Sequence, residues 1–145
     1  MNPHERFTSD HQALRQQAAA LRETLNKKAP TLSDFLSGFQ KEVQKHFKRE
    51  ESYYRILDTD KRVPDRGLIH QLRNDHAAII FTLESLVIRL RKNGADADWQ
   101  RRFDTLMNVL LPHLDQEDSH LFPLGKSLLT PAEIESVREH IQNCD

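Results

Sequence analysis

Two histidine–glutamate pairs, set within a repeating apolar pattern, are the feature that most restricts how this chain can fold. Apolar residues recur at intervals of three and four through most of the sequence, which is the period of an α-helix. On that apolar face, His46 is followed four residues later by Glu50, and His113 by Glu117. Residues four apart share one side of a helix, so we expect both pairs to face the core.

The pattern predicts an all-α protein, an antiparallel up-down four-helix bundle followed by a short C-terminal fifth helix. The predicted helices span about residues 3–28, 32–57, 68–93, 98–124 and 131–142. Asp96 or Asp98 is expected to cap the fourth helix, and Thr130 and Pro131 to open the fifth. The inward faces are predicted to carry Phe7, Leu14, Ala18, Leu21, Leu25, Leu32, Phe35, Phe39, Val43, Tyr53, Leu57, Ile69, Leu72, Ile79, Leu83, Leu86, Leu90, Trp99, Phe103, Leu106, Leu110 and Leu124.

Length and charge predict one soluble domain without a polyanionic partner. We expect a single domain over residues 1–145, with the bundle at about residues 3–125. The 21 basic and 22 acidic residues leave a net charge of -1, so no overall field favours nucleic acid or a membrane surface. No apolar run approaches the ~18 residues of a membrane span, and we expect a cytoplasmic protein. The single cysteine, Cys144, excludes an internal disulfide.

The two halves of the chain repeat one polar signature. The first half carries Asp10, His11, His46 and Glu50, and the second carries Asp75, His76, His113 and Glu117. In an antiparallel hairpin, two residues face each other when they are equally far from the connecting loop, because both helices rise ~1.5 Å per residue. Counted from the predicted helix ends, all four histidines lie near one level. The sequence therefore predicts four imidazoles and two carboxylates in one layer of the core.

Such a layer is typical of a metal site. A buried carboxylate without a partner is costly, and neither arginine nor lysine falls on the predicted inward faces at that level. Imidazole suits iron, zinc, copper or nickel, whereas an oxygen-only set suits calcium or magnesium. Two carboxylates between two pairs of histidines can bridge two metal ions.

These residues resemble the hemerythrin-like (HHE) cation-binding domain. The resemblance rests on His11, His46-Phe-Lys-Arg-Glu50, His76 and His113-Leu-Asp-Gln-Glu117 with Asp118-Ser-His-Leu-Phe-Pro123 after it, and it covers about residues 10–124. It implies an up-down four-helix bundle with two iron ions in an oxo- or hydroxo-bridged centre that meets dioxygen, nitric oxide or peroxide. It also implies that the four histidines are terminal ligands and that Glu50 and Glu117 are bridges.

Two positions depart from the oxygen-carrying hemerythrins. Those proteins place two histidines four apart on the third helix, and Ile80 stands at the second of these positions. His120, seven residues after His113, lies close to the same helical line and is a seventh candidate ligand. Its alternative is a buried histidine hydrogen-bonded to Glu117. Tyr53 could bind iron, donate a hydrogen bond to bound oxygen or pack in the core.

Other polar residues receive less direct roles. Tyr54 takes the place of the preceding tyrosine if the register is shifted by one, and Asp118 is the reserve bridging carboxylate. His4 is expected at the surface or at the end of the bundle, and His70 and His140 in solvent.

We interpret the chain as a di-iron protein that binds or senses a small molecule, or that reports iron or redox state. One alternative is an enzyme with peroxidase-like or catalase-like activity, and another is an iron donor in repair of iron–sulfur clusters under nitrosative stress. The pair Glu117 and His120 matches the Glu-x-x-His motif of ferritin-like enzymes, but Glu50 and Tyr53 do not. The histidine-rich set therefore favours binding over oxidation of an organic substrate. The sequence identifies no protein partner.

Overall fold

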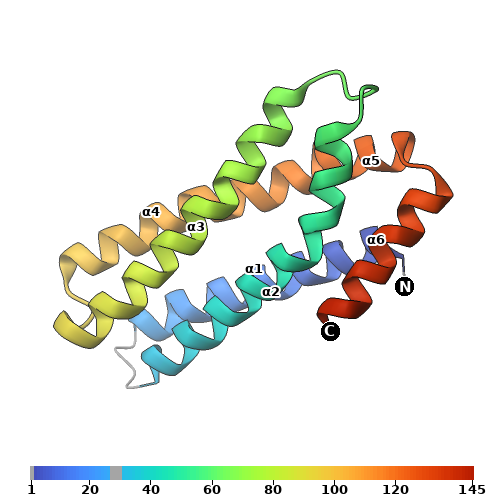
Figure 1. Ribbon diagram of the computed structural model, residues 1–145. Coiled ribbons are helices and arrows are strands. Elements are labelled where there is room, and N and C mark those ends of the chain that lie inside the picture. Colours follow the sequence, from blue (N-terminus) through green and yellow to red (C-terminus); the bar gives the residue numbers. More distant parts are fainter. Residues whose placement is uncertain (1, 27–30) are drawn as a thin grey trace.

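The computed structural model describes residues 2–26 and 31–145, and these residues form helices and no strand. The four long helices are α1 (Pro3–Asn26), α2 (Leu32–Thr59), α3 (Arg66–Asn93) and α4 (Ala97–Gln116). They run alternately up and down, so that each is antiparallel to the next (Figure 1). The predicted all-α four-helix bundle is confirmed. The predicted end of the first helix, near Lys28, lies outside the described residues.

Local sequence signals explain where the helices begin and end. Asp96 caps α4 by accepting a hydrogen bond from the Trp99 amide at 2.8 Å, which decides between the two predicted capping aspartates. Asp65 caps α3 in the same way. Gly94 ends α3 with φ of 71°, a left-handed conformation that glycine adopts without strain.

The end of the fourth helix differs from the prediction. α4 stops at Gln116 and is followed by a π-helix, η1 (Glu117–Leu121), and then by α5 (Phe122–Leu128). The last helix, α6 (Pro131–Cys144), begins with a capping box between Thr130 and Glu133. It packs against α2 and α1 at the end of the bundle that carries both termini (Figure 1).

The buried apolar residues form two clusters with a polar layer between them. The larger cluster fills α1 to α4 towards the α1–α2 and α3–α4 connections, and the terminal cluster lies beneath α5 and α6. Along α1, Phe7 belongs to the terminal cluster and Leu14 to the larger one. His11 lies between them and is fully buried. The polar layer is therefore shielded by apolar side chains at both ends.

One prediction about burial was wrong. Phe35 is 52% exposed, while Leu36 is fully buried and takes its place, because one residue turns a helix by 100° and brings a different side chain inward. His4, expected at the surface or at the end of the bundle, lies at the bundle end, where it is 6% exposed and packs against Tyr53 and Phe122. Tyr53 and Phe122 belong to the terminal cluster.

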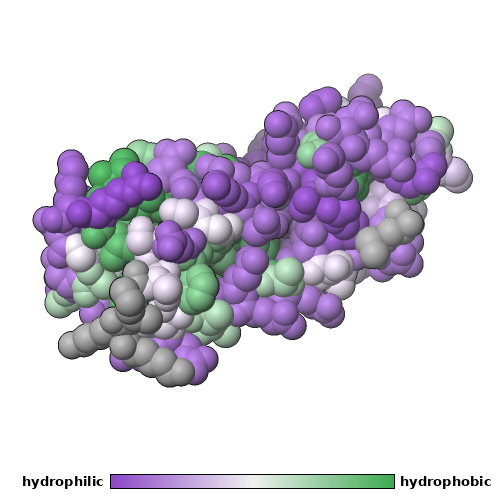
Figure 2. All heavy atoms as spheres, turned by 90° about the horizontal axis from the view of Figure 1, so that it is seen from below, coloured by the Kyte–Doolittle hydropathy of each residue, from purple (hydrophilic) through white to green (hydrophobic). Residues whose placement is uncertain are grey.

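The face of the molecule shown in Figure 2 is mostly hydrophilic. In Figure 2, apolar side chains gather towards the end that holds the α1–α2 and α3–α4 connections, and polar side chains cover the end near the termini. None of the helices in the described part of the chain is both long enough and apolar enough to cross a membrane.

Candidate metal centre

The structure brings six of the seven predicted site residues into one buried layer. Each long helix contributes one histidine, and the two carboxylates come from α2 and from the first residue of η1. The six are His11, His46, Glu50, His76, His113 and Glu117. Five of them are buried and His76 is partly buried. Counting residues from the predicted helix ends therefore gave the correct height along the bundle at which these side chains meet.

The six residues form two overlapping groups that share both glutamates. The N-terminal half-site consists of His11 and His46 with the glutamates, and the C-terminal half-site consists of His76 and His113 with the same glutamates. Within each group, one ligand atom from every residue lies within 4.8 Å of the others. Sharing of Glu50 between the groups is the arrangement that a bridging carboxylate requires, and the same holds for Glu117.

The distances within the layer suit coordination of an ion. The paired histidines approach through their Nε2 atoms, at 3.1 Å in both half-sites. Oε1 of Glu117 lies 3.1 Å from Nε2 of His11 and 3.2 Å from Nε2 of His113, in different half-sites. Ligands about 2.1 Å from one metal ion and at right angles around it are separated by about 3 Å. The donor spacing therefore fits cations between these atoms.

The carboxylates also lack the hydrogen bonds that burial demands. Both oxygens of Glu50 and Oε1 of Glu117 are buried without a hydrogen-bond partner, although imidazole nitrogens lie within 4 Å of them. The nitrogens and oxygens are close but poorly aligned for hydrogen bonds with each other. Orphaned buried carboxylate oxygens need an explanation, and a cation between them and the imidazoles provides one. The residues present thus fit a pair of bound metal ions.

Without a metal ion, the buried imidazoles and carboxylates shift each other's pKa values. Burial lowers the pKa of His11, but its hydrogen bond with Asp118 and the nearby charged carboxylates of both glutamates outweigh it and raise that pKa to about 11. Burial raises the pKa of Glu117, but the close imidazoles of three histidines outweigh this effect and bring the pKa well below its usual value. Protonated imidazoles therefore neutralise the carboxylates of the metal-free protein. Metal ions would replace these protons.

Three aspartates orient the histidines from outside. Asp118 lies 2.9 Å from Nδ1 of His11, Asp10 lies 3.0 Å from Nδ1 of His46, and Asp75 lies 3.1 Å from Nδ1 of His113. A carboxylate on Nδ1 places the proton there and leaves the Nε2 lone pair for a metal ion. Asp118, expected as a reserve bridge, instead supports a histidine.

The repeated Asp-His dipeptides were the sequence signal for two of these aspartates. Asp10 and Asp75 are recognisable in the sequence as parts of the repeat, but the repeat indicates no contact for them. Each lies beside a histidine in sequence yet contacts the histidine of the following helix. Only the packing of neighbouring helices shows this pairing.

The tyrosine at the site is Tyr54. Its hydroxyl donates a hydrogen bond to Oε2 of Glu117 at 2.5 Å, and its ring packs edge-on against His76. The hydroxyl of Tyr53 instead lies 2.8 Å from Nε2 of His4. Tyr53, which the sequence left open as a ligand, a donor or a packing residue, is therefore fully buried in the terminal cluster.

His120, the seventh predicted ligand, lies elsewhere. It is exposed and belongs to neither group of donors. The prediction assumed an unbroken α-helix, in which a residue seven positions after His113 returns to nearly the same side. A π-helix closes i to i+5 hydrogen bonds and turns less per residue, so the π-helix η1 directs His120 to the outside.

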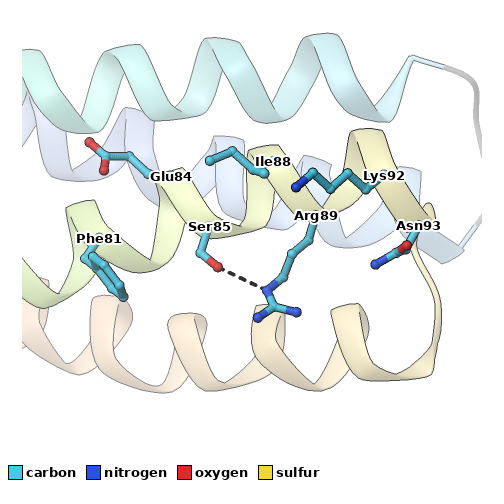
Figure 3. A pocket seen from close by; sticks show the side chains of 7 residues that line it. All are labelled: Phe81, Glu84, Ser85, Ile88, Arg89, Lys92 and Asn93. Atoms are coloured by element: carbon cyan, nitrogen blue, oxygen red, sulfur yellow. Dashed lines mark hydrogen bonds between the residues drawn. The ribbon is translucent and has the colours of Figure 1, made fainter.

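A surface hollow along α3 is separate from this layer. Its lining runs from Phe81 to Asn93 on a single helix, and Arg89 donates a hydrogen bond to Ser85 at 3.2 Å (Figure 3). None of the six donor residues lines this hollow.

Comparison with known proteins agrees with the geometry. The family model of the hemerythrin HHE cation-binding domain matches residues 2–125, which include all six donor residues and end before α6. Searches of curated proteins and of solved structures found no match. The chain belongs to the hemerythrin HHE cation-binding domain family.

Proposed function

We propose that this protein holds two iron ions in a carboxylate-bridged, non-haem site that binds or senses a small molecule such as dioxygen, nitric oxide or peroxide. The observation that carries the proposal is the buried layer in which three carboxylate oxygens lack hydrogen bonds and face inward-pointing imidazoles. Imidazole and carboxylate together suit iron. Cations in this layer would satisfy these three carboxylate oxygens.

Each residue then has a defined task. His11 and His46 would hold one ion, the two histidines of the C-terminal half-site would hold the other, and Glu50 and Glu117 would bridge them. Bound iron would supply the redox and ligand-binding chemistry. The chain itself orients the imidazoles through the aspartates, and the two apolar clusters keep bulk water away. Two histidines and two shared carboxylates for each ion leave room in its coordination sphere for a small molecule.

Metal loading tests the site. The metal-free protein would be loaded with ferrous iron without oxygen and then oxidised, and we expect two irons per chain and the absorption bands of an oxo-bridged ferric pair. Replacing His113 by alanine should remove these bands. His120→Ala is the matched control, because His120 is exposed outside the layer, and it should keep them. One iron per chain, or equal damage from both substitutions, would refute the proposal.

Reaction with dioxygen separates the proposed function from its alternatives. A carrier forms a lasting adduct, a sensor autoxidises, and a peroxidase-like enzyme turns over peroxide repeatedly. Because Ile80 stands where an oxygen carrier has a further histidine, we expect autoxidation within seconds to minutes of mixing. A stable oxygen adduct, followed by absorption, would favour a carrier instead.

A further inference from the structure

The two half-sites share their inner design, so any difference between them must arise outside the donor atoms. In each, two Nε2 atoms are 3.1 Å apart, and both half-sites use the same glutamates. The contacts made by the Nδ1 atoms of the imidazoles, on the side away from the glutamates, differ between the two half-sites.

In the N-terminal half-site, both imidazoles are held by a carboxylate. Asp118 contacts Nδ1 of His11 and Asp10 contacts Nδ1 of His46. In the C-terminal half-site, only His113 has such a partner. Within residues 2–26 and 31–145, no hydrogen bond holds Nδ1 of His76, whose ring stacks on Phe47 with centroids 3.9 Å apart.

Arginines reinforce the aspartates of the N-terminal half-site. Arg15 donates to Asp118 at 2.7 Å, and Arg49 donates to Asp10 at 3.1 Å. In the described part of the chain, Asp75 has no arginine partner. Its ion pair is with His113 alone.

The support of the N-terminal half-site extends to α6. The side chain of Asp145 accepts hydrogen bonds from Arg6 at 2.9 Å and from Arg49 at 3.0 Å. Arg6 also donates to Asp10 at 3.3 Å. A continuous series of charged hydrogen bonds therefore links the end of α6 to His46. The family match ends at residue 125, so α6 supplies support that lies outside the matched region.

Exposure differs in the same direction. The side chain of His76 is 14% exposed, whereas those of His11 and His46 are 0% and 1% exposed. His113 is 0% exposed, so water and chelators reach the C-terminal half-site more readily on the side of His76.

From these observations we propose that the two metal positions are unequal: the N-terminal half-site binds its ion first and holds it, and the C-terminal half-site binds second and exchanges its ion. The inference rests on the proposed metal function. When a metal ligand loses the side chain that hydrogen-bonds its far side, the metal affinity typically falls by about 10-fold to 100-fold. The C-terminal half-site has one such carboxylate fewer, and we expect its affinity to be at least about 10-fold lower.

Zinc is a suitable probe because it binds imidazole and carboxylate and has no redox chemistry. The metal-free full chain would be titrated with Zn²⁺ by calorimetry, while nuclear magnetic resonance follows the histidine rings. We expect two binding steps. The first should shift the rings of His11 and His46, and only the second those of His76 and His113. A chelator added to the loaded protein should remove one ion quickly, with His76 and His113 returning to their metal-free signals.

Substitutions of the supporting aspartates test which of them controls each zinc-binding step. Asp118→Asn should weaken the first step by about 10-fold and leave the second unchanged, and Asp75→Asn should weaken only the second. Arg15→Gln, at a residue partly exposed on α1, acts through Asp118 and should weaken the first step with the fold intact. The matched control is Asp58→Asn, because Asp58 holds the exposed His70 at 2.8 Å in the same kind of pair. This control should change neither step.

The outcomes distinguish this inference from the proposed function. If zinc binds neither half-site, the metal function itself fails. If two ions bind with equal affinity, or if the first ion shifts His76 and His113, the metal function stands and the inequality is refuted. Equal weakening of both steps by Asp118→Asn would also refute it.

Discussion

Tyr54 lies outside the set of donor residues but donates a hydrogen bond to one of them, Glu117. Burial and the nearby glutamates raise the pKa of Tyr54 well above its usual value, so it remains a neutral donor. Tyr54→Phe leaves Oε2 of Glu117 without this donor. We expect the metal-free protein to lose about 1.5–3 kcal/mol of unfolding free energy, as for a hydrogen bond to a charged group, measured by denaturant unfolding.

Tyr53→Phe is the matched control for Tyr54→Phe. It removes a hydroxyl from a neighbouring, equally buried tyrosine whose partner is His4. Its cost should be about 0.5–1.5 kcal/mol, as for a bond between neutral groups, and the spectrum of the loaded site should not change. An altered iron spectrum in Tyr53→Phe alone would contradict the assignment of Tyr54 to the site.

The burial of His4 predicts a pH dependence of stability. Burial and, to a lesser extent, Lys126 lower its pKa from 6.5 to about 4. The unfolded chain therefore binds a proton between these two pKa values while the folded chain does not, so the unfolding free energy falls as the pH decreases from 6.5 to 4. We expect a contribution of about 1–2 kcal/mol, allowing for partial solvent screening. His4→Gln cannot titrate, and its stability should fall less than that of the unsubstituted protein over this range. Parallel curves for the two proteins would contradict the prediction.

At the scale of elements, α5 rests on α2 at a contact that only glycine permits. A Cβ atom at Gly125 would overlap the Tyr53 hydroxyl and lie 2.5 Å from its Cζ. Gly125→Ala should therefore push α5 from α2 and cost about 1–3 kcal/mol, as overpacking does. Thermal unfolding measures the loss.

Gly38→Ala is the control for this contact. Gly38 is an exposed residue within α2, and a Cβ atom there would meet nothing within 4 Å. Alanine in the interior of a helix should stabilise the protein by about 0.5–1 kcal/mol. If both alanines shift the melting temperature in the same direction, α5 does not rest on Tyr53 as described.

For the whole molecule, the protons held in the metal-free layer predict how metal binding depends on pH. The pKa of His11 is raised to about 11, and those of His46 and His76 are also raised, by hydrogen bonds and nearby carboxylates that outweigh burial. In the metal-free protein His11 is protonated at neutral pH, and the raised pKa values of His46 and His76 favour their protonated forms, whereas a metal ion needs these imidazoles neutral. Binding should release about one to three protons per chain, and affinity should rise with pH. Calorimetry in buffers of different ionisation enthalpy measures this release, and a buffer-independent enthalpy would count against it.

Features that depend on regular helical geometry were predictable from the sequence. Within an unbroken helix, a spacing of four residues determines that His46 and Glu50 share one face. The constant rise per residue determines the level at which His11 meets them. The repeat in the second half of the chain extended the same reasoning to His76 and His113. The bundle and the gathering of these six side chains in one layer could accordingly be predicted from the sequence.

Features that depend on irregular helical geometry or on contacts between helices became known only from the tertiary structure. The π-helix η1 turns His120 outward, and no spacing in the sequence announced that change in residues per turn. Asp10 contacts the histidine of the neighbouring helix, and α5 and α6 cover the end of the bundle where His4 is buried. The sequence by itself determined the donor layer, because helical periodicity is local; the supports of that layer depend on how separate helices pack, and only the folded structure specifies them.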